Sequence, residues 1–87
     1  MEEINKIENK LKRKLNSKEN EYVNMWVNQY NYNFEIISIA LYYSTNEENP
    51  NFKYLNCLIK DWYERGLKTK DDIVTMIESM YRKYDKF

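Results

Sequence analysis

The sequence has one glycine and one proline among its 87 residues, and this scarcity restricts the folds open to the chain. Tight turns, β-bulges and phosphate-binding loops rely on glycine, because it adopts positive φ without steric cost. A chain with so few of these residues is best built from helices joined by short polar links. We therefore expect an all-α fold, a compact bundle of about five short helices that forms a single domain over residues 1–87.

Apolar residues recur at helical spacing along most of the chain. The expected helices run from about Glu3 to Leu15, from Lys18 to Gln29, from Phe34 to Ser44, from a cap at Asn49 or Asn51 to Arg65, and from Thr69 onward. Residues 45–51 are polar and predict a loop. The stretch from Ile36 to Tyr43 has enough β-branched residues to form a strand, but no second strand is evident to pair with it, which favours a helix.

Capping residues indicate where most of these helices begin and end. Ser17 and Asn33 are suitable caps for the second and third helices. Thr69, with Asp72 three residues later, resembles a capping box at the start of the fifth helix. Gly66 can adopt the left-handed conformation that ends a helix. The basic residues 12–14 suit the carboxyl end of the first helix.

The formal net charge is zero, but the charges fall into blocks. Residues 1–18 carry six basic and three acidic side chains, a net charge of +3. Residues 19–52 carry five acidic and no basic side chains, a net charge of −5. Residues 53–70 carry five basic and two acidic side chains, again a net charge of +3. Two basic blocks therefore surround an acidic one, and each block has to be considered separately.

The side chains that support most enzyme chemistry are scarce. The chain has no histidine and one cysteine, Cys57, so the common zinc sites cannot be assembled. No glycine-rich loop is present to hold a nucleotide. Carboxylate pairs such as Asp71-Asp72 are adjacent residues, which point to different sides of a helix. We therefore expect a non-enzymatic binding domain with no catalytic residues, metal, cofactor or small-molecule substrate.

Two features predict a cytoplasmic protein. A single cysteine cannot form an internal disulfide, which fits a reducing compartment. No apolar run approaches the roughly 18 residues of a membrane span, and the charged amino terminus lacks the apolar stretch of a signal peptide. No membrane partner is expected.

The fourth expected helix has the widest apolar surface. At about 100° per residue, Tyr54, Leu58 and Trp62 fall at about 0°, 40° and 80° around its axis. The apolar arc continues to about 180° through Leu55, Ile59 and Tyr63. Such an arc is wider than the stripe a helix usually buries, so one edge is expected to be partly exposed.

The cations of this helix are distributed unequally around it. Arg65 falls at about 20°, inside the edge formed by Tyr54, Leu58 and Trp62, whereas Lys53 and Lys60 lie on the polar side. Rings beside cations suit single-stranded DNA, because bases stack on aromatic faces and cations meet phosphates. The alternative is that the row packs into the core and only orients the helix, as aromatic stripes at this spacing usually do.

The segment from Asn51 to Trp62, followed by Gly66-Leu67-Lys68-Thr69, resembles the carboxyl-terminal domain of the DnaD and DnaB-like replication-initiation proteins of low-GC Gram-positive bacteria and their phages. That family carries a Tyr-x-x-x-Ile-x-x-x-Trp motif, which Tyr54, Leu58 and Trp62 match with Leu in the Ile position. The resemblance covers most of residues 17–75. The family's full-length proteins also have a winged-helix amino-terminal domain, for which this chain has no space, so a DnaD-like helical domain is expected to fill residues 1–87.

The resemblance implies a role in DNA replication initiation, as a primosome component that binds single-stranded DNA through the motif helix and the segment after it. It also implies contact with replication initiator or helicase-loading proteins. The DNA-binding residues expected on this basis are Tyr54, Leu58, Trp62, Lys53, Lys60, Arg65 and Lys68. Family members often have a basic tail, which is diluted here because Asp85 lies among Arg82, Lys83 and Lys86.

Two alternatives remain open. The domain could dock a replication initiator or helicase loader with little DNA affinity of its own. It would use either the acidic residues 19–52 or the edge formed by Tyr54, Leu58 and Trp62, which we call the motif edge. The basic cluster from Lys10 to Lys14 could be a second DNA site, although a solvated helix end is the interpretation we favour. Trp26, which has Val23 and Val27 at helical spacing, is expected in the core.

Overall fold

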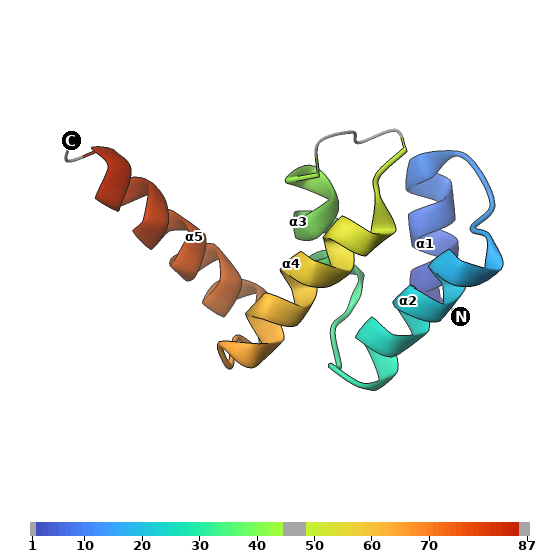
Figure 1. Cartoon of the computed structure of the whole chain (residues 1–87), viewed down its shortest axis with the longest axis horizontal. Coiled ribbons are helices and arrows are strands. Elements are labelled where there is room, and N and C mark those ends of the chain that lie inside the picture. The colour runs from blue at the N-terminus through green and yellow to red at the C-terminus, as the bar shows by residue number, and fades with distance from the viewer. Residues whose placement is uncertain (1, 45–48, 86–87) are drawn as a thin grey trace.

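Five α-helices make up the part of the chain described by the computed structural model, residues 2–44 and 49–85, with side chains described through residue 80 (Figure 1). In chain order they are α1 (Glu2–Leu11), α2 (Ser17–Asn28), α3 (Phe34–Tyr42), α4 (Phe52–Glu64) and α5 (Lys70–Asp85). No strand occurs among these residues, and the stretch with the strand alternative forms α3. The all-α prediction is confirmed. Residues 45–48, part of the predicted loop, lie outside the described residues.

Two helices end at least two residues earlier than predicted. α1 ends at Leu11 rather than Leu15, because Lys12 adopts a φ of 58°, which lies in the left-handed region and breaks the helix. Residues 12–14 therefore follow the helix, and Lys10 is the basic residue in its last turn. α3 ends at Tyr42 rather than Ser44.

The cap of α2 is Asn16, and the prediction of Ser17 was wrong. The Asn16 side chain accepts a hydrogen bond from Glu19 N at 2.8 Å, and Glu19 Oε1 accepts one from Asn16 N at 3.0 Å. This reciprocal pair is a capping box, in which the residue three positions after the cap accepts from the cap's backbone N–H and is most often Glu or Gln. Ser17 has Asn20 at that distance, so only Asn16 completes the box.

The caps of α3 and α4 are asparagines. Asn33 caps α3 as predicted. Of the two residues proposed for α4, the structure selects Asn51, whose Oδ1 accepts from Lys53 N at 2.9 Å and from Tyr54 N at 3.3 Å. These bonds satisfy backbone donors that the first turn of a helix otherwise leaves unpaired.

The turn between α4 and α5 agrees closely with the prediction. Gly66 has a φ of 78°, and Leu67 N donates to Trp62 O at 3.1 Å, so the chain folds back on the end of α4. At the start of α5, Asp72 N donates to Thr69 Oγ1 at 3.1 Å, and Asp72 Oδ2 accepts from Thr69 N at 3.2 Å. Backbone N–H groups of residues 68 and 69 also lower the pKa of the Asp72 carboxyl. The start of α5 is therefore fixed close to the end of α4.

One core draws side chains from all five helices. Its buried members are Ile7, Leu11, Leu15, Val23, Trp26, Tyr32, Ile36, Ile37, Ala40, Leu41, Phe52, Leu55, Ile59, Trp62 and Ile73. Trp26 is fully buried, as predicted; its ring stacks on Phe52 with centroids 5.9 Å apart, and its Nε1 donates to Asn56 Oδ1 at 3.0 Å. These contacts hold α4 against α2.

α5 extends beyond the rest of the bundle. Figure 1 shows it leaving the foot of α4 and running away from α1 and α2. Ile73, near its start, is fully buried, whereas Met80, two turns later, is exposed. The helix is therefore anchored at its amino-terminal end. None of the helices in the described ranges is long and apolar enough to cross a membrane.

Candidate functional site

The row Tyr54, Leu58 and Trp62 runs from the surface of α4 into the core. Tyr54 is 46% exposed, Leu58 is half-buried, and Trp62 is 2% exposed. The two interpretations of the row, core packing and ligand contact, therefore apply to different residues. Trp62 is a core side chain that orients the helix, and Tyr54 presents its ring to solvent.

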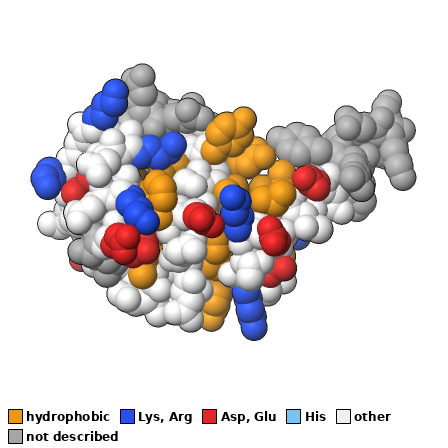
Figure 2. Space-filling model, turned by 180° about the vertical axis from the view of Figure 1, so that it is seen from behind, with side chains coloured by type: hydrophobic (Ala, Val, Ile, Leu, Met, Phe, Trp, Pro, Cys, Tyr) orange, Lys and Arg blue, Asp and Glu red, His pale blue; other side chains and the backbone are white. Residues whose placement is uncertain are grey.

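These side chains line a groove of about 360 Å³, which we call the motif groove. Its lining residues are Tyr43, Tyr54, Leu58, Asp61, Trp62, Arg65, Met76, Ile77 and Met80. They come from the end of α3, from α4 and from the part of α5 that runs away from the bundle. Figure 2 shows apolar side chains gathered where this projecting arm meets the globular part.

Arg65 lies at the motif groove with Tyr54, as the helical wheel predicted. Its Nε donates to Asp61 Oδ2 at 2.8 Å, one turn earlier on α4. Both side chains of this pair are more than half exposed. A pair in this position is held weakly, because water solvates both ions and screens their attraction. The guanidinium therefore remains accessible to another anion.

Lys53, Lys60 and Lys68, also predicted to bind DNA, do not line the motif groove. Lys60 Nζ lies 4.0 Å from Glu64 Oε1 on the exposed side of α4. Lys53 is exposed next to Tyr54, and Lys68 is exposed in the turn after α4. The structure thus brings together four of the seven predicted residues, Tyr54, Leu58, Trp62 and Arg65. It leaves Lys53 and Lys60 on the flanks of α4 and Lys68 in the turn after it.

The opposite wall of the motif groove was missed as part of a site. Met76, Ile77 and Met80 lie at helical spacing on α5, and Tyr43 directly follows α3. In the structure they face the motif edge, and Met80 is exposed. The sequence signal was a stripe at residues 73, 76, 77 and 80, but a stripe does not say which helix packs against it.

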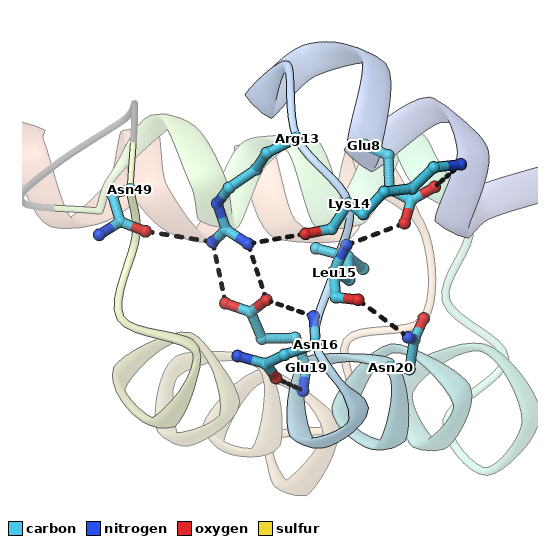
Figure 3. Close-up of polar contacts among 8 residues, drawn as sticks. All are labelled: Glu8, Arg13, Lys14, Leu15, Asn16, Glu19, Asn20 and Asn49. Carbon is cyan, nitrogen blue, oxygen red and sulfur yellow. Dashed lines mark hydrogen bonds and ion pairs between the residues drawn. The ribbon is translucent and has the colours of Figure 1, made fainter.

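The basic residues after α1 form a different environment (Figure 3). Arg13 donates to both carboxylate oxygens of Glu19, at 2.8 and 2.9 Å, and to Asn49 Oδ1 at 3.1 Å. Lys14 Nζ lies 3.6 Å from Glu8 Oε1. The hydrogen bond from Arg13 lowers the pKa of Glu19, and the same bond raises the pKa of Arg13. These contacts tie α1, α2 and the start of the α4 segment together. The prediction of a solvated helix end was therefore wrong for Arg13, which follows α1 and is held in a part-buried ion pair.

Within the ranges described, no group of three His, Cys, Asp or Glu side chains is placed to hold a metal ion. Cys57 is exposed on α4. The motif groove offers the exposed rings of Tyr54 and Tyr43, one exchangeable guanidinium and a mostly apolar wall. Such a surface can bind and position a ligand.

Comparison with known proteins gives one result. The family model DnaB_2, described as replication initiation and membrane attachment, matches residues 4–77. No curated protein and no solved structure matches the chain. The matched segment includes the motif row, the turn at Gly66 and the first half of α5. The chain therefore belongs to this DnaD-like domain family and has a role in replication initiation.

Proposed function

We propose that this domain serves replication initiation as a non-catalytic, cytoplasmic module that binds single-stranded DNA along the motif edge of α4. One observation carries the proposal: the half-exposed Tyr54 ring and the Arg65 guanidinium line the same groove. Ring and cation together are what single-stranded DNA requires, since bases stack on aromatic faces and phosphates attract cations.

The contact residues have different roles in this proposal. Tyr54 stacks on a base, which is worth about 1–3 kcal/mol per base in such complexes. Arg65 exchanges the Asp61 carboxylate for a phosphate, and the exposed pair that it gives up contributes only about 0.5 kcal/mol. Leu58 and Trp62 act as positioning residues, because Trp62 is part of the core and Leu58 packs against it, which holds α4 in place.

Lys53 and Lys60 assist from the flanks of α4, and Lys68 assists from the turn after it. Among the side chains described, no carboxylate lies within ion-pairing distance of Lys53 or Lys68, so both are open to phosphates. Lys60 gives up a long, exposed pair with Glu64. If about three phosphates are contacted, the logarithm of the affinity falls against the logarithm of salt concentration with a slope near −2.

Fluorescence anisotropy of labelled single-stranded DNA at low and moderate salt tests the proposal. We expect a variant with Tyr54→Ala and Arg65→Ala to bind at least tenfold more weakly than wild type, because it loses both the stacking ring and the guanidinium. Tyr63→Ala is the matched control, since Tyr63 is on the same helix, is 48% exposed and does not line the motif groove. Its binding should change less than twofold.

Two results contradict the proposal. One is the absence of binding by wild type at low salt. The other is unchanged binding by the double variant while its helical circular dichroism matches that of wild type. Either result would leave the motif edge without a role in DNA contact.

A second candidate function is the docking of a replication initiator or helicase loader at the same groove. The observation that favours it is the composition of the wall, where Met76, Ile77 and Met80 supply apolar surface and Asp61 compensates the charge of Arg65. Met80→Glu separates the two functions. It should abolish binding of a purified initiator or loader protein if docking is the function, and it should weaken DNA binding only modestly if the ring and the guanidinium are the contacts.

A further inference from the structure

Two tyrosines at the carboxyl end of α3 form an aromatic surface beside the motif groove. Tyr42 is 66% exposed, more than any other large apolar side chain described. Its ring meets the Tyr43 ring edge to face, with centroids 5.0 Å apart and planes at 89°. Tyr43 also lines the motif groove opposite Tyr54. The exposed rings therefore continue from α4 across the end of α3.

A second groove, of about 560 Å³, lies on the far side of Tyr43, and we call it the α3 groove. Tyr42 and Tyr43 both line it, together with Lys10 of α1 and Lys70 of α5. Tyr43 and Ile77 thus form the wall shared by the two grooves. A polymer lying in the motif groove meets the α3 groove next along the surface.

The fold changes the charge available at this place. In the sequence, Tyr42 belongs to the acidic block of residues 19–52, which carries no cation. In the structure, Lys10 and Lys70 come to it from the two basic blocks, and no carboxylate of the described side chains lies within ion-pairing distance of either. Glu35 and Glu78 line the same groove and offset the two lysines. Stacking on Tyr42 is therefore expected to contribute more than phosphate contacts.

We infer that a single DNA strand bound at the motif groove continues over Tyr43 into the α3 groove, where a further base stacks on Tyr42 and Lys10 and Lys70 approach the phosphates. The inference rests on the proposed function and specifies the path and the length of the strand. It assigns to Tyr42 a role in binding long strands that short strands do not need.

Anisotropy with oligothymidines of four and twelve nucleotides at low salt tests the path. Wild type and the Tyr63→Ala control should prefer the longer strand by the same factor. Part of this preference arises because a longer strand can bind in more positions. Tyr42→Ala should weaken binding of the twelve-nucleotide strand about tenfold and change that of the four-nucleotide strand less than twofold. Tyr42→Phe, which keeps the stacking face, should bind both strands as wild type does.

The lysines provide a second measurement that does not depend on the tyrosine. A variant with Lys10→Gln and Lys70→Gln should bind the twelve-nucleotide strand a few-fold more weakly and show a shallower salt dependence. Both lysines are exposed, so the replacements are expected to leave the fold intact. Circular dichroism of each variant checks that expectation.

The outcomes separate this inference from the proposed function. If Tyr42→Ala and the double lysine variant bind the long strand as wild type does, while Tyr54→Ala weakens both lengths, the path is wrong and the proposed function stands. If wild type binds neither strand at low salt, both are wrong. Selective weakening of the longer strand by Tyr42→Ala supports both.

Discussion

The corner between α1 and α2 and the groove between α4 and α5 each hold an arginine in an ion pair, but they hold it differently. Arg13 makes two hydrogen bonds to Glu19, whose side chain is only 12% exposed. Arg65 makes one hydrogen bond to Asp61, whose side chain is 53% exposed. Both arginines belong to sequence blocks with a net charge of +3, so net charge does not distinguish them.

The difference lies in what else each carboxylate does. Glu19 also accepts from Asn16 N in the capping box, so a ligand that displaced it from Arg13 would disturb the start of α2 as well. Asp61 sits one turn before Arg65 on the surface of α4, and replacing its contact costs little. The corner therefore uses its cation for stability, and the motif groove keeps its cation available.

The largest effect is expected at Trp62, where the wall of the motif groove is also core. Trp62→Ala should lower the free energy of unfolding by about 3–5 kcal/mol, because a buried ring is replaced by a cavity. Urea denaturation followed by circular dichroism measures the change. Lys53→Ala, at an exposed position on the same helix, is the control and should change it by less than about 0.5 kcal/mol. A small effect of Trp62→Ala would mean that this wall is not part of the core.

The next effect tests the corner. Glu19→Gln should lower the free energy of unfolding by about 2 kcal/mol, since the side chain keeps one acceptor oxygen but loses its charge and the second hydrogen bond from Arg13. The same variant should bind DNA as wild type does. Weaker DNA binding by folded Glu19→Gln would show that the corner is a binding surface after all, and the comparison would fail.

The same pair gives a pH dependence with a defined sign. The hydrogen bond from Arg13 lowers the pKa of Glu19 below its ordinary value of 4.5. Its contribution is therefore complete above pH 4.5 and is lost as the pH falls through the lower folded-state pKa. The difference in stability between wild type and Glu19→Gln should be constant near neutral pH and shrink under acid. If the free energies of unfolding of the two proteins fall in parallel as the pH is lowered, this account is contradicted.

A smaller effect is expected where the motif groove is fastened to the rest of the fold. The buried Tyr32 hydroxyl donates to the carbonyl of Leu67, in the turn between α4 and α5, at 2.5 Å. Tyr32→Phe should lower the free energy of unfolding by about 1 kcal/mol, the usual net value of one hydrogen bond. Thermal unfolding of wild type and variant measures it, and a more stable variant would contradict the assignment.

Tyr32 also predicts a titration. Burial raises its pKa to about 12, and the nearby tyrosines add to the shift. Because the folded-state value lies above the unfolded value of 10.0, the contribution is complete below pH 10 and is lost as the pH rises through 12. An absorbance titration of tyrosinate should therefore lose a step near pH 12 in Tyr32→Phe. If the steps of the two proteins coincide, Tyr32 is not buried as described.

The fold was largely predictable from the sequence because its signals are local. Asn33, Gly66 and Thr69 each act within a few residues, and the structure confirms all three. Ser17 is a suitable cap by residue type, but Glu19 lies three residues after Asn16, and this partner places the cap one residue earlier. The early end of α1 depends on the positive φ of Lys12, for which a lysine gives no sequence signal.

The site was predictable only in part, because its two walls come from different helices. The wheel of α4 placed Tyr54 with Arg65 correctly, since both lie on one element. It could not supply Met76 or Met80, because the angle at which α5 leaves the bundle is set by tertiary packing. It also could not show that Arg13 and Arg65 differ, since their pairing depends on side-chain geometry.

The smallest effect bears most directly on the comparison. Asp61→Asn removes the partner of Arg65, and Glu64→Gln removes the partner of Lys60, so each change deletes one negative charge one turn from a cation on α4. General attraction of DNA by the added positive charge would raise affinity equally in both. Asp61 lines the motif groove and Glu64 does not. If DNA contacts Arg65 in this groove, Asp61→Asn should bind single-stranded DNA about twofold more tightly than Glu64→Gln at low salt. Anisotropy titrations in parallel resolve such a ratio. Equal gains would show that Arg65 acts through the overall field of the helix. The distinction between its accessible guanidinium and the part-buried pair at the corner would then have no consequence for binding.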